Sequence, residues 1–282
     1  MKIQRALLTA ASPSQRTLPL QSLVDRDGAR RTALAIILEE VTAAGVEEVG
    51  IVICPGDQAA YQAAAGGHAA RLRFIEQTSP LGYGHAVHCG REFIGNSPFL
   101  LLVADHLYVS SSERGCAAQL LHIAGTEECA VSAVQPTHES KLNRYGAAGG
   151  RLVAGRPGLY EIEDLIEKPT PTEAEQRLIV PGLRAGHYLC YFGMHVLTPA
   201  VMDILDERLR EVSDPTHRQL TGALRVLADR ERYLAAELQG QRFDIAEKYG
   251  LLTAQLALAL QGSGREEVLS ILLELLASQR SR

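Results

Sequence analysis

Short apolar runs separated by helix-like segments recur along the chain, and this alternation limits its possible folds more than any other feature. Five runs have the composition of strands: residues 5–11, 49–54, 99–105, 129–134 and 187–197. Residues 30–45 have the apolar spacing of a helix and end in Gly45, a typical helix terminator. Strands that alternate with helices predict a parallel or mixed sheet with both faces covered. We therefore expect an α/β fold.

The rest of the chain adds one β-ribbon and a helical end. Residues 145–169 are glycine-rich and strand-like without a helix period, which predicts a β-ribbon excursion from the main sheet. After Pro199 the pattern is helical, returns to a strand near residues 233–240, and closes with two helices split at residues 261–266. No repeat or long linker is visible, so we expect one compact unit: a main domain over residues 1–250 and C-terminal helices, residues 251–282, packed on it.

Composition and charge exclude several classes of function. The 282 residues carry a net charge of −5 and no basic stripe with interleaved aromatic residues, so we expect no nucleic acid partner. The apolar run at the N-terminus is too short for a signal peptide, and no run approaches the length of a membrane span. We therefore expect a cytoplasmic protein with no membrane partner. The five scattered cysteines lack metal-ligand pairing and are interpreted as reduced core residues, with a catalytic thiol as the alternative.

Residues 76–87, EQTSPLGYGHAV, have the order expected of a nucleotide site. A strand ending near Gln77, a loop with Gly82 and Gly84, and a helix would place backbone N–H groups at the end of the sheet where ligands bind. Gln77 offers one acceptor and two donors, which complement the edge of a pyrimidine base. The alternative is a simple turn with an exposed amide.

Two aspartates follow strand-like runs and are candidate metal ligands. Asp105 comes directly after the apolar run LLLVA, and Asp244 lies between a short strand-like piece and a helix. Hard oxygen ligands at such positions suit a Mg²⁺ ion that bridges phosphates. The alternative for either aspartate is a helix cap or a turn. Lys168, in the tight context IEKP, is one of only four lysines among 28 basic residues, and it is either a compact phosphate-binding charge or a solvated side chain.

Eight collinear stretches resemble the sugar-1-phosphate nucleotidyltransferases, and most closely the bacterial UTP–glucose-1-phosphate uridylyltransferases. They are RALLTAASPSQRTLP, EEVTAAGVEEVGIVI, EQTSPLGYGHAVHCGREFIGNSPFLLLVAD, RYG, DLIEKPTP, AGHYLCYFGMHVLTP, RQLTGAL and FDIAEKYGLLTA. The resemblance implies a Rossmann-like three-layer fold with a mixed, mainly parallel central sheet and a β-ribbon. It also implies a Mg²⁺ cofactor and an in-line attack of a sugar 1-phosphate on UTP, which gives a UDP-sugar and pyrophosphate, with dTTP as the alternative nucleotide. A homo-oligomer, dimer or tetramer, formed through the C-terminal helices, is implied as well.

The matched positions imply roles for individual residues. The nucleotide would be bound by Ala10, Ala11, Gln77, Gly82, Gly84 and His85. The sugar phosphate would be bound by Tyr145, Gly146, Glu167, Lys168 and His187, and the metal by Asp105 and Asp244. Arg16 and Lys168 would be the catalytic residues, which neutralise charge on the transferred phosphate.

The phosphate-handling end departs from the family pattern. Ser12, Pro13, Ser14 and Gln15 replace a glycine-rich signature, and proline removes an N–H while fixing φ. The family's phosphate-binding lysine has no clear counterpart, and the arginines that would replace it are Arg26, Arg30 or Arg31. Gly222 stands in place of a carboxylate, and His187 in place of an arginine. These changes leave two alternatives open: a catalytically silent nucleotide-sugar binder that acts as a sensor or partner subunit, and a transferase that moves a different group.

Overall fold

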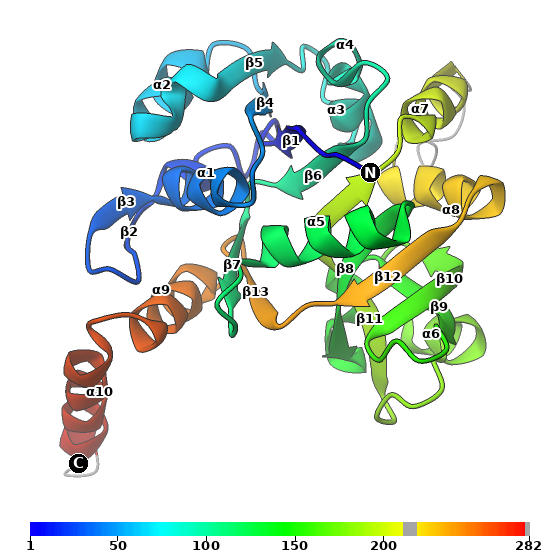
Figure 1. Cartoon of the computed structure of the whole chain (residues 1–282). Coiled ribbons are helices and arrows are strands. Elements are labelled where there is room, and N and C mark those ends of the chain that lie inside the picture. The colour runs from blue at the N-terminus through cyan, green and yellow to red at the C-terminus, as the bar shows by residue number, and fades with distance from the viewer. Residues whose placement is uncertain (211–218, 280–282) are drawn as a thin grey trace.

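A nine-stranded sheet is the centre of the computed structural model, which describes residues 1–210 and 219–279 (Figure 1). The strand order across this sheet is β5 (Leu72–Glu76), β4 (Glu48–Ile53), β1 (Arg5–Thr9), β6 (Phe99–Val103), β11 (His187–Leu197), β8 (Ala130–His138), β12 (Tyr233–Glu237), β10 (Leu159–Ile166) and β9 (Ala147–Leu152). All five predicted strand runs are strands of this sheet.

The sheet is mixed and mainly parallel, as predicted. Strands β5, β4, β1 and β6 are parallel to one another, and β8 is parallel to β12. Strand β11 is antiparallel to both β6 and β8, and β10 is antiparallel to both β12 and β9. The apolar runs form strands because both faces of the sheet are covered; residues 99–102, for example, are fully buried.

Helices cover both faces of the sheet and give three layers. Helices α1 (Ala33–Ala43) and α5 (Cys116–Glu127) contribute to the core on one face. Helices α3 (Tyr83–Cys89), α7 (Ala200–Arg210) and α8 (Leu220–Arg230) contribute to the core on the other. The helix predicted over residues 30–45 begins later, at Ala33. Thr32 caps it by accepting a hydrogen bond from the Ala35 N–H at 3.0 Å, while residues 30–32 belong to a strand, β3.

Three two-stranded ribbons accompany these layers among the described residues. The predicted ribbon over residues 145–169 is the β9–β10 hairpin, and hydrogen bonds to β11 and β12 join it to the edge of the main sheet. Strand β3 (Arg30–Thr32) pairs with β2 (Ser22–Val24). Strand β7 (His106–Ser110) leaves the sheet directly after β6 and pairs with β13 (Gly240–Asp244). The last ribbon therefore brings the segments that follow Asp105 and precede Asp244 side by side.

Two C-terminal helices close the chain, as predicted. Helix α9 (Gly250–Gln261) packs on the body through Ala254 and Leu258, and the side chain of Gln255 bonds to both backbone groups of Val24 at 2.8 and 2.9 Å. Helix α10 (Arg265–Gln279) extends away from the sheet (Figure 1). Its apolar side chains are largely exposed, between 47% and 67%, at Ile271, Leu273, Leu275 and Leu276. Residues 280–282 of the predicted C-terminal unit lie outside the described residues.

Shorter helices connect these elements. They are the 3₁₀ helices η1 (Leu18–Leu20), η2 (Gly66–Arg71) and η3 (Glu139–Arg144), and the α-helices α2 (Gln58–Ala64), α4 (Arg91–Ile94) and α6 (Pro171–Arg177). Within residues 1–210 and 219–279, no helix has the combination of length and apolar character that crossing a membrane requires.

Candidate active site

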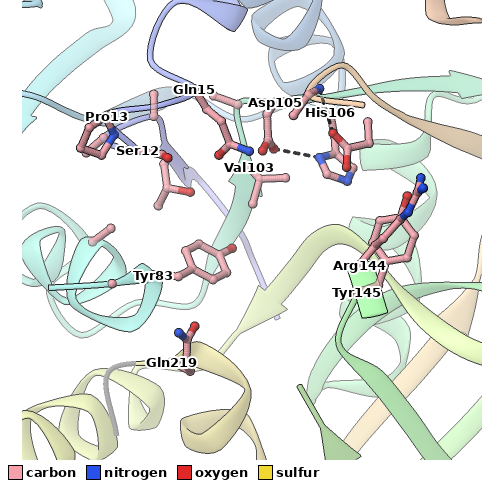
Figure 2. Close-up of a pocket in the computed structure, with 18 of the residues that line it drawn as sticks. Ser12, Pro13, Gln15, Tyr83, Val103, Asp105, His106, Arg144, Tyr145 and Gln219 are labelled. Atoms are coloured by element: carbon pink, nitrogen blue, oxygen red, sulfur yellow. Dashed lines mark hydrogen bonds and ion pairs between the residues drawn. The ribbon is translucent and has the colours of Figure 1, made fainter. Parts of the chain in front are cut away.

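A cavity of about 650 Å³ opens at the carboxyl ends of the parallel strands (Figure 2). Its walls come from the segments that follow β1, β5, β6 and β10, from the segment before β9, and from the end of β13. Ligands of open α/β sheets bind at this edge, because there the loops converge and backbone N–H groups face outward. Nine of the predicted site residues line the cavity: Ala10, Ala11, Gln77, Gly82, Asp105, Tyr145, Glu167, Lys168 and Asp244.

Gln77, which lines the cavity, is held in one orientation. Its side chain is buried, and its amide nitrogen lies 2.8 Å from His85 Nδ1 and 3.3 Å from the Gly82 carbonyl oxygen, to which it donates. Because both amide hydrogens have acceptors within the protein, the carbonyl oxygen Oε1 is the atom left to a ligand. An acceptor at this point complements the N3–H of uracil or thymine, whereas N3 of cytosine is itself an acceptor.

The two glycines that were predicted to lie in the loop before helix α3 differ in position. Gly82 has φ of +112°, which favours glycine, and it directly precedes the helix. Gly84, predicted to lie in the loop, is instead buried inside the first turn of α3, because the helix begins at Tyr83. His85 lies one residue further along this helix and contacts Gln77 rather than lining the cavity.

Arg16 lies outside the cavity lining, beside the segment that departs from the family pattern. Backbone N–H groups of Gln15 and Arg16 donate to the Ser12 carbonyl oxygen at 3.0 and 2.9 Å, so the segment after Ala11 forms a tight turn. The Arg16 guanidinium lies 3.4 Å from Asp57 Oδ1 and does not line the cavity. Ser12, Pro13 and Gln15 line it instead (Figure 2).

The arginines considered as replacements for the family lysine also lie outside the cavity lining. Arg31 pairs with Asp25 at 2.7 Å, and Arg26 lines a second, separate cavity between α1 and α5. Arg30 is exposed in β3. The Lys and Arg residues that line the site, among those described, are Lys168 and Arg144, and Arg144 forms an ion pair with Glu247. Arg144 belongs to the stretch RYG, in which the sequence predicted roles only for Tyr145 and Gly146.

Glu167, at another part of the cavity lining, has a hydrogen-bonded carboxylate. Glu167 Oε2 accepts a hydrogen bond from Thr221 Oγ1 at 2.5 Å, and Gly146 lies against the same carboxylate and the ring of Tyr191. Lys168 has φ of +48°, in the left-handed region. A residue with a Cβ pays about 1–2 kcal/mol there, and such strain is concentrated at functional sites.

His187 and Arg242 both lie outside the cavity lining. His187 begins β11, and its ring packs edge-on against His138 at 5.4 Å between centroids, outside the cavity lining. Arg242 is buried below the cavity wall, with its guanidinium 4.0 Å from the centroid of the Tyr145 ring. Burial lowers the pKa of Arg242. No sequence signal marked Arg242, since its position depends on the pairing of β13 with β7.

Asp105, His106 and Asp244 form a cluster that can hold a metal ion. One ligand atom from each lies within 4.8 Å of the others, and His106 Nδ1 is 2.8 Å from Asp105 Oδ1 (Figure 2). His106 and Asp244 are direct partners in the β7–β13 ladder, and the Ile245 N–H donates to the Asp105 carbonyl oxygen at 2.9 Å. The backbone register therefore positions all three residues. Two carboxylates and an imidazole are a donor set that fits a divalent cation.

The two carboxyl groups of this cluster have different proton affinities. Burial raises the pKa of Asp244, and the charge of Asp105 adds to this effect. Burial also acts on Asp105, but the hydrogen bond and charge of His106 outweigh it and lower the Asp105 pKa.

The capping alternative is wrong for both residues, because β7 follows Asp105 and α9 begins only at Gly250 with Tyr249 at its N-cap. Asp244 does form a turn, in which Oδ1 accepts from the Ala246 N–H at 2.9 Å.

A thiol nucleophile is not favoured at this site. Cys54, Cys116, Cys129 and Cys190 are buried and Cys89 is partly buried, as expected for core residues, and none of them lines the cavity. Burial raises the pKa of Cys89, and it raises that of Cys129 to about 11, which opposes thiolate formation.

The chain is similar to known transferases of nucleotides. A family model described as nucleotidyl transferase matches residues 26–261, a range that begins after the altered loop. A UTP–glucose-1-phosphate uridylyltransferase of Bacillus subtilis is 26% identical over 286 residues, with 92% of each chain covered. A second one from that organism, YngB, is 34% identical over 68% of this chain and 59% of its own length. The crystal structure of a UDP-glucose pyrophosphorylase complexed with UDP-glucose superposes with a TM-score of 0.74 at 25% identity, covering 91% of this chain and 98% of that one.

Proposed function

Because the chain belongs to the nucleotidyl transferase family, we propose that it forms a UDP-sugar and pyrophosphate from UTP and a sugar 1-phosphate, with Mg²⁺ as the implied cofactor. Glucose 1-phosphate is the first sugar to test, since relatives of 26% and 34% identity are named for it. The observation that carries the proposal is one cavity that combines the oriented amide of Gln77, the Asp105–Asp244 pair, and Glu167 with Lys168. The fixed acceptor on Gln77 suits uracil and thymine equally, so dTTP is the alternative nucleotide.

The reaction requires the protein to align two anionic substrates. An oxygen of the sugar phosphate attacks the α-phosphorus of UTP, a new P–O bond forms, and the bond from that phosphorus to the bridging oxygen of the leaving pyrophosphate breaks. Lys168 and Arg144 are the side chains placed to neutralise phosphate charge, and Glu167 is placed to accept hydrogen bonds from sugar hydroxyls. Fixed charges of this kind lower the barrier because they need no reorganisation during the reaction.

The charge of the cavity itself favours a bound cation. Four carboxylates line it, from Asp105, Glu167, Asp244 and Glu247, against the two permanent cations of Lys168 and Arg144. A nucleoside triphosphate brought beside these carboxylates would be repelled. A divalent ion held by Asp105 and Asp244 would offset this repulsion and neutralise charge on the phosphates.

The silent-binder alternative is favoured by one observation. Arg16 pairs with Asp57, and the arginines of residues 26–31 lie away from the cavity, so the triphosphate end has few cations of its own. The test is release of pyrophosphate from UTP, glucose 1-phosphate and Mg²⁺, run beside thermal shifts with UTP and with UDP-glucose. Release supports the transferase. A shift with UDP-glucose and no release supports the binder.

Two substitutions test whether pyrophosphate is released by a reaction in this cavity. Lys168→Gln is expected to lower turnover by about hundredfold or more, the loss typical of removing a transition-state charge partner. Lys141→Gln is the matched control, because Lys141 is exposed on η3 and outside the cavity lining. Asp105→Asn is expected to remove turnover while the fold is retained. Equal activity of the two lysine variants would contradict the assignment of Lys168.

We further propose that residues 251–279 form a contact between copies of the chain. Helix α10 contacts mainly α9 and projects from the body (Figure 1). Its residues Ile271, Leu273, Leu275 and Leu276 expose large apolar side chains. Apolar surface of this extent on a helix pair is typical of an interface.

A further inference from the structure

His106 makes the metal cluster different from one built of carboxylates alone. Its side chain is buried, with only 8% of the residue exposed, and it stands directly across the β7–β13 ladder from Asp244. One edge of its ring faces Gly193, where a Cβ would lie 3.4 Å from His106 Cδ2. The opposite edge carries Nδ1, which faces Asp105 at 2.8 Å. Packing therefore directs a nitrogen, rather than a carbon, toward the two carboxylates.

We propose that His106 is a third protein ligand of the metal, through Nδ1, and that the site consequently prefers a divalent transition-metal ion such as Co²⁺ or Zn²⁺ to Mg²⁺. This inference rests on the proposed function for the presence of a metal beside the phosphates. In the metal-bound form Nδ1 would coordinate through its lone pair, and the ring would carry its proton at Nε2. The hydrogen bond from Nδ1 to Asp105 is then replaced by two bonds to the same ion.

The chemistry of the donor atoms gives the direction of this preference. Mg²⁺ is a hard ion that binds one or two carboxylates and keeps several water molecules, and it gains little from an imidazole. Imidazole nitrogen suits the softer transition-metal ions, whose affinities rise along the series toward copper. A nitrogen ligand added to two carboxylates therefore raises the affinity for Co²⁺ or Zn²⁺ more than the affinity for Mg²⁺.

The experiment measures Co²⁺ and Mg²⁺ binding to the whole protein by calorimetry, without nucleotide. His106→Asn substitutes an oxygen donor and is expected to reduce the ratio of Co²⁺ to Mg²⁺ affinity by about tenfold or more, since losing even an indirect partner of a metal costs at least this factor. His122→Asn is the matched control, because His122 is exposed on α5 and outside the cavity lining. An unchanged ratio in folded His106→Asn overturns the proposal.

A second measurement, on the wild-type protein, tests the proposal even if His106→Asn does not fold. In wild-type protein loaded with Co²⁺, a ligating imidazole gives a strongly shifted, exchangeable N–H resonance in the proton NMR spectrum, which His106→Gln should lack. Absence of this resonance in the wild type overturns the proposal. Pyrophosphate release is measured separately. A preference for Co²⁺ that depends on His106, without pyrophosphate release, would contradict the proposed function and support the role of His106. Release of pyrophosphate with a metal ratio that His106→Asn leaves unchanged would support the proposed function and overturn the role of His106.

Discussion

Gly146→Ala tests whether the surroundings of Glu167 are as tightly packed as the structure shows. A Cβ at this position would lie 2.8 Å from Tyr191 Cδ2, 3.0 Å from Glu167 Oε2 and 3.2 Å from Thr221 Oγ1. Gly146 does not have positive φ, so the cost is steric. The buried Tyr191 ring has little room to move, and overpacking of this kind destabilises a fold by about 1–3 kcal/mol.

The second effect of Gly146→Ala is on binding. If the added methyl group displaces Glu167, the KM for glucose 1-phosphate should rise by about tenfold, equivalent to about 1.4 kcal/mol, while the KM for UTP changes little. Urea denaturation gives the free energy of unfolding, and initial rates give both constants. Gly125→Ala is the control with the opposite sign. This glycine lies inside α5, and an added Cβ would lie 3.6 Å from the Met1 carbonyl oxygen, an ordinary van der Waals distance, so alanine should stabilise the fold by about 0.5–1 kcal/mol. Unchanged stability and KM in Gly146→Ala would refute the reasoning.

Three further predictions follow from other parts of the molecule. CTP should be used about hundredfold less efficiently than UTP, because the fixed Oε1 of Gln77 faces a lone pair of cytosine; His85→Phe, which frees the amide, should narrow the difference in kcat/KM. His195 is buried and its pKa is lowered to about 3, so an unfolded chain binds the proton first as pH falls below about 6.5. Stability should therefore decline from about pH 6.5 toward pH 3, by up to about 1.4 kcal/mol per pH unit, and His195→Phe should show a shallower decline in urea titrations. Leu273→Glu on α10 should reduce the mass of the assembly in light scattering, whereas an assembly of unchanged mass would place the interface elsewhere.

Much of the fold could be predicted because local pattern decides it. Residues 99–103 and 187–197 form strands where continuous apolar runs indicated them, and the C-terminal helices separate within the predicted residues 261–266. The start of α1 was predicted three residues early, because Thr32 caps the helix while the residues before it pair with β2. Strand pairing between segments that are distant in sequence could not be predicted, because neither segment alone contains a signal for it.

The same limit applies to the cavity. Asp105 and Asp244 could be predicted since each ends a strand-like run, but that they meet depends on the β7–β13 register. His106 did have a usable signal, a histidine directly after the strand-end aspartate, whereas Thr221 and Arg242 reach Glu167 and Tyr145 through tertiary packing. The direction of Arg16 depends on Asp57, which no spacing rule connects to it. The assigned roles of these residues stay predictions until the variants are measured.

The β7–β13 ribbon has a consequence for the order of assembly during translation. Strands β1, β4, β5 and β6 are adjacent in the sheet and are all synthesised before residue 110, so the part of the cavity around Gln77 can form on a nascent chain. Asp105 emerges with them, but its partner Asp244 is synthesised only near the end. Until then the Asp105 carboxylate remains a solitary ligand. A chain interrupted before Gly240 would keep the part of the cavity around Gln77 but would lack one carboxylate of the proposed metal site.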